Sequence, residues 1–172
     1  MSGATSLPKL TIRFATVEDA ETIHRAMIGI ATIMGEREKV VSTPDDIRRF
    51  GFGQNPAFEA LVAEVDGYCA GVCVFFASFS TYRGEPGAYV QDLFVEPAMR
   101  GSGVGARLLQ RLAAVTRERG GGYIRLSVDV RNAGAQAFYT RLGIKKSPGE
   151  QIHAAYDGDF DALAAADARR DA

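Results

Sequence analysis

The chain has 172 residues, 47% of them hydrophobic, with 20 Lys and Arg against 21 Asp and Glu. This suffices for one well-buried core and not for two, so we predict a single domain over residues 1–172 with its core at about 10–165. A net charge of −1 excludes a general attraction to nucleic acid or to an anionic membrane; no apolar run approaches a membrane span, and residues 1–9 lack the apolar stretch of a signal peptide, so we expect a cytoplasmic protein.

Hydrophobic periodicity in the first half predicts a strand, two helices and a three-stranded meander. The predicted elements are a strand at residues 10–14, a helix from Thr16 to about Met34, a helix opened by Thr43 and Pro44, and strands at 58–65, 70–82 and 88–96. The turns at Asp66-Gly67 and at residues 84–87 connect the three later strands closely, which favours antiparallel pairing.

A strongly amphipathic helix is predicted after residues 100–105, and Gly120-Gly121-Gly122 ends it. A strand at 123–130, a helix at 133–141 and a last strand at 151–156 complete the order. This order predicts an α/β fold with helices on both faces of a mixed, mostly antiparallel sheet.

Cysteine and histidine spacing predicts neither a disulfide nor a metal site. Cys69 and Cys73 lie four residues apart in a predicted strand, about 13 Å from each other, which is too far for a disulfide. His24 and His153 are far apart in the chain, so no metal cluster is indicated.

The glycine-rich run from Arg100 to Gly105, between a strand and a helix, predicts a phosphate cradle. Glycines let backbone N–H groups approach an anion, and the first turn of the helix adds unpaired donors and the positive end of its dipole. The alternative is a flexible turn without a ligand, which the flanking strand and helix disfavour.

Two other glycine motifs fit less well. A P-loop requires Lys and Ser or Thr after its last glycine, and here Ala106 and Arg107 follow. Gly101, Gly103 and Ala106 satisfy the dinucleotide pattern G-x-G-x-x-A, but residues 96–99 separate them from the strand and too little chain follows for a second nucleotide-binding half.

Two separate motifs resemble those of the GNAT superfamily of N-acyltransferases. Arg100-x-x-Gly103-x-Gly105, after the strand residues 91–95, resembles its acyl-CoA motif [Q/R]-x-x-G-x-[G/A], and the run from Asn132 through Phe138-Tyr139 to Leu142-Gly143 resembles N-x-x-A-x-x-F-Y-x-x-L-G. The resemblance extends from about residue 10 to 163 and implies the GNAT fold.

The resemblance implies acetyl-CoA as cosubstrate. In the family, the strand before the cradle bulges and splays from its neighbour, and the backbone of Leu93, Phe94 and Val95 would hold the pantetheine. The residues expected to hold the pyrophosphate are Arg100, Gly101, Ser102, Gly103, Val104, Gly105 and Ala106. Asn132 would order the start of the next helix or bind CoA.

The same resemblance implies the catalytic candidates. Tyr139, in the second motif, would protonate the CoA thiolate, because a phenol can donate a proton to a forming thiolate. Relatives often relay the amine proton to a carboxylate, for which Asp92 and Glu64 are available. Gln91 stands where the diamine and spermidine/spermine acetyltransferase branch usually has Glu, and its amide cannot act as that base.

We therefore predict an N-acetyltransferase acting on a small amine such as an amino acid, a diamine or a related metabolite. Two alternatives stay open: acetylation of a protein N-terminus or lysine, and a noncatalytic acyl-CoA sensor. The residues from Gln151 to Leu163 resemble the tail of the small-amine branch, which implies a homodimer. Arg131, where that branch commonly has an aromatic residue, and Gln91 both depart from the polyamine pattern.

Overall fold

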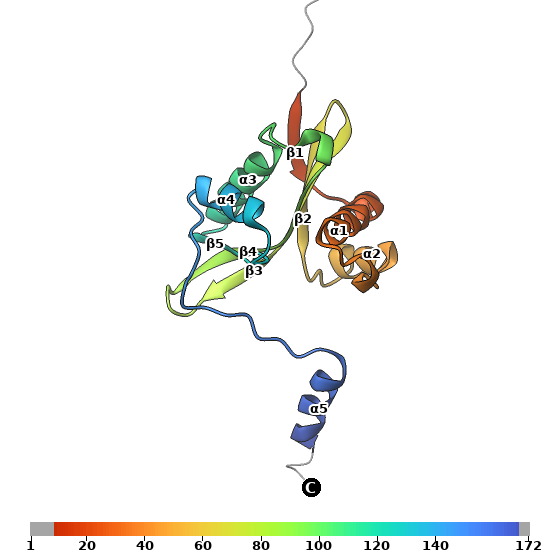
Figure 1. Ribbon diagram of the computed structural model, residues 1–172, viewed down its shortest axis with the longest axis vertical. Helices are drawn as coiled ribbons and strands as arrows, with labels where there is room; N and C mark the ends of the chain where they lie inside the picture. The colour runs from red at the N-terminus through yellow and green to blue at the C-terminus, as the bar shows by residue number, and fades with distance from the viewer. Residues whose placement is uncertain (1–8, 169–172) are drawn as a thin grey trace, which may run out of the picture. The chain divides into compact units, whose positions relative to one another are not determined.

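A computed structural model describes residues 9–168 and contains a mixed sheet with helices on both of its faces (Figure 1). The strands, in their order across the sheet, are β1 (Leu10–Phe14), β2 (Glu59–Val65), β3 (Tyr68–Ser80), β4 (Glu85–Val95) and β5 (Tyr123–Leu126). The first four pair antiparallel, and β5 lies parallel to β4. This confirms the predicted mixed, mostly antiparallel α/β fold.

The helices fall into two groups. They are α1 (Ala20–Met34), α2 (Pro44–Phe52), α3 (Val104–Glu118), α4 (Ala133–Arg141) and α5 (Asp157–Ala168), with short 3-10 turns η1 (Val17–Asp19), η2 (Arg37–Lys39) and η3 (Pro97–Met99). Contacts divide the chain after Val130 into two compact units, so the sheet and α1 to α3 belong to the first, and α4 and α5 to the second.

α1 and α3 cover opposite faces of the sheet (Figure 1). Val72 of β3 is fully buried in a cluster with Ile23 of α1. The preceding residue, Gly71, faces α3, since a Cβ there would lie 3.1 Å from Val104 and 3.2 Å from Leu108. Successive residues of a strand point to opposite faces, so the two helices bury the two sides of the same strands.

A charged cluster ties β1, β2 and the start of α1 together. The Arg13 guanidinium donates to both carboxylate oxygens of Asp19, at 2.7 and 2.9 Å, and to Glu64 at 2.7 Å. These bonds hold the pKa of Asp19 below its usual range. Glu64 is therefore committed to Arg13, which leaves it a poor candidate for a catalytic base.

Two predicted strands differ from the structure. The strand expected over 123–130 ends at Leu126, and residues 151–156 form no strand. Strands gain most of their stability from cross-strand partners, which an alternating pattern alone does not supply. The helix at Ala133–Arg141 has the predicted bounds.

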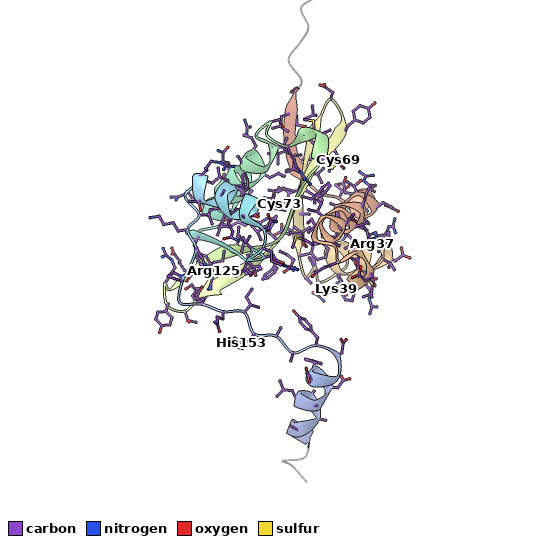
Figure 2. All side chains as sticks on the ribbon, in the orientation of Figure 1. Arg37, Lys39, Cys69, Cys73, Arg125 and His153 are labelled. Atoms are coloured by element: carbon purple, nitrogen blue, oxygen red, sulfur yellow. The ribbon has the colours of Figure 1, made fainter. Side chains whose placement is uncertain are left out.

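The two cysteines of β3 are free (Figure 2). Burial raises the pKa of the Cys73 thiol to about 12, so it stays protonated at neutral pH.

None of the helices within residues 9–168 combines the length and apolarity needed to cross a bilayer.

Candidate active site

The sheet contains a β-bulge in the middle of β4. Val74 of β3 pairs with Asp92, whereas the next residue, Phe75, pairs with Val90. Gln91 is therefore an extra residue on β4. A bulge of this kind bends its strand and increases the local twist.

β4 and β5 part at this bulge. Their parallel pairing runs from Gly87–Tyr123 to Val90–Leu126 and stops there. From Gln91 to Val95, β4 keeps β3 on one edge but has no strand on the other edge within the described residues. Backbone N–H and C=O groups on such an edge are available to an extended ligand.

At this edge β4 can bind a ligand through its backbone groups rather than through its side chains. The Phe94 side chain is only 7% exposed and packs in the core under α1. The packing is close, since a Cβ at Gly29 of α1 would lie 2.5 Å from the Phe94 ring. Leu93 and Val95 alternate with Phe94 and so point to the α3 side.

The segment that the sequence predicts to be a phosphate cradle, Arg100 to Gly105, lies between β4 and the start of α3. Gly101 and Gly103 have φ angles of +78° and +89°, and a Cβ on either would meet no atom within 4 Å. The left-handed backbone, rather than lack of space, therefore requires glycine. The N–H groups of Val104, Gly105 and Ala106 begin the helix, have no intrahelical acceptor and lie at the positive end of its dipole.

The side chains of Arg100 and Ser102 stabilise the segment that connects β4 to α3. Arg100 Nε donates to the carbonyl oxygen of Val95 at 3.3 Å, which joins the cradle to the end of β4. The Ser102 hydroxyl donates to the carbonyl oxygen of Met99 at 2.5 Å and closes the turn that follows η3. The unpaired edge of β4 and the helix start are thus linked through one short segment.

Asp92 is the titratable group at the point where the strands part. Its side chain lies on the α1 face, like that of Val74 opposite, and it is half-buried. Burial raises the pKa of Asp92 to about 6. Its carboxylate makes no hydrogen bond or salt bridge within residues 9–168. Gln91 beside it is exposed and uncharged.

Asn132 and Tyr139 belong to the second unit. Asn132 Oδ1 accepts from the Ala135 N–H at 3.0 Å and caps α4. The Tyr139 ring is half-buried and tilted by 60° against Phe138, with 5.2 Å between centroids. The structure thus brings the candidates from Gln91 to Ala106 together along β4 and the start of α3, and places these two on the capped helix α4.

The sequence did not reveal a group of aromatic and hydroxyl side chains on β3 and β4 and at the end of β5. Phe76 and Tyr89 stack with centroids 5.0 Å apart, and the Tyr89 hydroxyl lies 2.5 Å from Ser127 Oγ. The Tyr123 hydroxyl lies 2.6 Å from Ser78 Oγ. The alternation of Phe76 and Ser78 indicated that they share a face, but their partners depend on a register that sequence alone does not provide.

The chain matches the acetyltransferase (GNAT) family over residues 28–144, more than half of its length. A thialysine N-epsilon-acetyltransferase from Bos taurus is 31% identical over 140 residues, covering 77% of this chain and 82% of that protein. A spermidine/spermine N(1)-acetyltransferase-like protein 1 from Homo sapiens is 27% identical over 146 residues, covering 81% of this chain and 21% of that protein. Among solved structures, an integron cassette protein from the mobile metagenome of V. cholerae has a TM-score of 0.76 at 16% identity and covers 90% of this chain and 97% of that chain. The chain therefore belongs to the GNAT acetyltransferase family, in the branch of the thialysine and spermidine/spermine acetyltransferases, and is an N-acetyltransferase.

Proposed function

We propose that this N-acetyltransferase uses acetyl-CoA as donor and acetylates its acceptor at the cleft where β4 parts from β5. The acceptor is the amine of a small metabolite. The amine nitrogen attacks the thioester carbonyl, a C–N bond forms, the C–S bond breaks, and the products are an N-acetylated amine and CoA. The observation that carries this proposal is the bulge at Gln91, which leaves the edge of β4 unpaired directly before the cradle of α3.

The proposed position of acetyl-CoA follows from the donors and acceptors available. An extended pantetheine chain would pair with the free backbone edge of Leu93, Phe94 and Val95 as a strand would. Its pyrophosphate would accept hydrogen bonds from the amides between Gly101 and Ala106, where the helix dipole favours negative charge. Arg100 adds a positive charge at the entrance of this cradle.

We assign the base to Asp92. An alkylamine has a pKa of about 10.4, so an acceptor arrives protonated at neutral pH and must lose a proton before it can attack. With a pKa of about 6, Asp92 is ionised at neutral pH yet more basic than an exposed Asp. Gln91 cannot take the proton, since a neutral amide is not a base at this pH.

We assign the acid to Tyr139, which would protonate the departing thiolate. Asn132 would support it indirectly, because it caps the helix that carries Tyr139. This role rests on the match between residues 132–143 and the family motif.

Two further features are proposed from the branch. One is a homodimer assembled through the residues from Gln151 to Leu163. The other is a cytoplasmic enzyme without nucleic acid or membrane as partner, in keeping with its net charge of −1.

The test is release of free CoA thiol from acetyl-CoA in the presence of a panel of amines. The panel contains L-lysine, cadaverine, spermidine and a lysine-containing peptide, and mass spectrometry identifies each product. Turnover with small amines supports the proposal. Turnover with the peptide alone would identify a protein acetyltransferase, and acetyl-CoA binding without turnover on any amine would identify a sensor; either result overturns the proposal.

A further inference from the structure

A side-chain hydrogen bond joins β4 to the end of β5 at the point where the two strands part. Their parallel pairing stops at Val90–Leu126. Ser127 is the first residue after β5, and its Oγ lies 2.5 Å from the hydroxyl of Tyr89 on β4. This bond therefore ties the chain that leaves β5 to a residue two positions before the bulge at Gln91.

The Tyr89 ring is oriented by a side chain of a third strand. Phe76 of β3 lies opposite Tyr89, and the two rings stack with 5.0 Å between their centroids and an interplanar angle of 21°. Stacking restricts the Tyr89 ring, so less side-chain entropy is lost when its hydroxyl bonds to Ser127. The connection thus runs from β3 through β4 to the end of β5.

The end of β5 has little else to hold it in the sheet. β5 contains four residues, and within residues 9–168 it is the outermost strand, with β4 as its single neighbour. The last residues of a short edge strand open most readily, because few backbone hydrogen bonds oppose their opening. The bond between Tyr89 and Ser127 adds a tie where the backbone pairing ends.

The position of this end matters for the ligand proposed above. The unpaired edge of β4, from Leu93 to Val95, begins just beyond the parting, and a pantetheine chain is proposed to pair with it. A parting that is already fixed need not be ordered when the ligand binds, which removes an entropic cost of binding. Neither hydroxyl is among the groups assigned to proton transfer, so its loss should affect binding rather than the chemical step.

Resting on the proposed function, we propose that Tyr89 and Ser127 are positioning residues for acetyl-CoA. Their hydrogen bond holds the end of β5 at the parting and so keeps the free edge of β4 preformed for the pantetheine chain. Phe76 contributes by orienting the Tyr89 ring. All three act through the backbone of the sheet and not on the reacting atoms.

The experiment measures the Kd of CoA by calorimetry and the KM of acetyl-CoA by CoA release, with the full-length protein. Ser127→Ala and Tyr89→Phe each remove one hydroxyl, and the second keeps the ring stack. We expect each variant to raise both constants about three- to tenfold, which corresponds to one hydrogen bond, with kcat nearly unchanged. The double variant should bind no more weakly than either single variant, because both remove the same bond. Ser127→Thr, which keeps the hydroxyl, should bind like the wild type.

The matched control is another tyrosine–serine hydrogen bond, at the opposite end of the β4–β5 pairing. The Tyr123 hydroxyl lies 2.6 Å from Ser78 Oγ, and the Tyr123 ring passes over Gly87, where a Cβ would lie 2.5 Å from it. This bond is the more buried of the two. Tyr123→Phe and Ser78→Ala should therefore lower the free energy of unfolding at least as much as Ser127→Ala, yet leave the Kd of CoA unchanged.

An unchanged Kd in either Ser127→Ala or Tyr89→Phe would overturn the proposal. Equal weakening of CoA binding in the control variants would overturn it as well, because the effect would then follow the stability of the sheet. Additive losses in the double variant would show that the two hydroxyls act separately and would also overturn it. Failure of the proposed function is distinguishable, because then the wild type itself does not bind CoA.

Discussion

At the scale of single residues, Asp92 is both the proposed base and a group whose ionisation affects the stability of the fold. A carboxyl whose pKa is raised to about 6 binds its proton more tightly in the folded than in the unfolded chain. Its contribution to stability is therefore fully present below its unfolded pKa of about 3.8 and is lost as the pH rises through 6. At neutral pH the ionised group lowers the free energy of unfolding.

Asp92→Asn should therefore lower the activity of the enzyme and raise the stability of its fold. We expect kcat/KM to fall by about 10² to 10⁴, and the rise of wild-type activity through pH 6 to disappear. The same variant should gain up to about 3 kcal/mol in unfolding free energy at pH 7, and this gain should vanish near pH 4.

Urea unfolding at both pH values and a pH–rate profile measure these effects. Asp45→Asn, on an exposed carboxylate of α2, serves as control and should show neither. A loss of stability at pH 7 in Asp92→Asn would show that the ionised Asp92 carboxylate does not destabilise the fold.

Tyr139→Phe should lower kcat by about 10² or more while acetyl-CoA binding stays nearly unchanged, because it removes only the hydroxyl proposed to protonate the thiolate. Calorimetry measures binding, and single-turnover rates measure chemistry. Tyr82→Phe, at a fully exposed tyrosine, is the control. Equal single-turnover rates in wild type and Tyr139→Phe would exclude this residue as the acid.

At the scale of elements, local signals predicted most of the fold. The hairpin Asp66-Gly67, the glycines around α3 and the bounds of α4 follow from chemistry within a few residues. The extra residue Gln91 and the stacking of Phe76 on Tyr89 depend on strand register, which arises between segments far apart in sequence. The glycine-rich segment before α3 could thus be located from the sequence, whereas the stacked pair of Phe76 and Tyr89 could not.

The cradle itself can be tested with two glycines of the same helix. Gly103 precedes α3 and Gly120 follows it; both have left-handed φ angles, +89° and +81°, and open space around a Cβ. Aspartate at either site costs similar backbone strain, but only Gly103→Asp places a carboxylate at the proposed pyrophosphate site.

Acetyl-CoA at about 100 times its dissociation constant should stabilise the wild type and the control variant Gly120→Asp by about 2.7 kcal/mol. It should hardly stabilise Gly103→Asp. Thermal unfolding with and without ligand measures the difference. An undiminished shift in folded Gly103→Asp would place the ligand elsewhere.

At the scale of the whole molecule, we expect a two-fold homodimer. Residues 151–163 form no strand in the single chain but carry exposed apolar side chains, namely Ile152, Tyr156, Phe160 and Leu163. Burial of these side chains against a second copy of the chain would remove apolar surface from water and so stabilise a dimer.

Light scattering at micromolar concentrations should give twice the mass of one chain, and Phe160→Glu with Leu163→Glu should reduce it to one. Tyr82→Glu, at an equally apolar exposed site outside the tail, should leave the mass unchanged. A monomeric wild type at all concentrations would refute the dimer.

The order of the strands also bears on how the chain folds. β2, β3 and β4 are neighbours joined by short turns, whereas β1 and β5 reach the sheet only through intervening helices. Contacts close in sequence form fastest, so the three-stranded meander should assemble early, and β5 should join after α3 has formed. The point where β4 and β5 part therefore lies between an early and a late part of the sheet, and the proposed active site is completed only when β5 has joined β4.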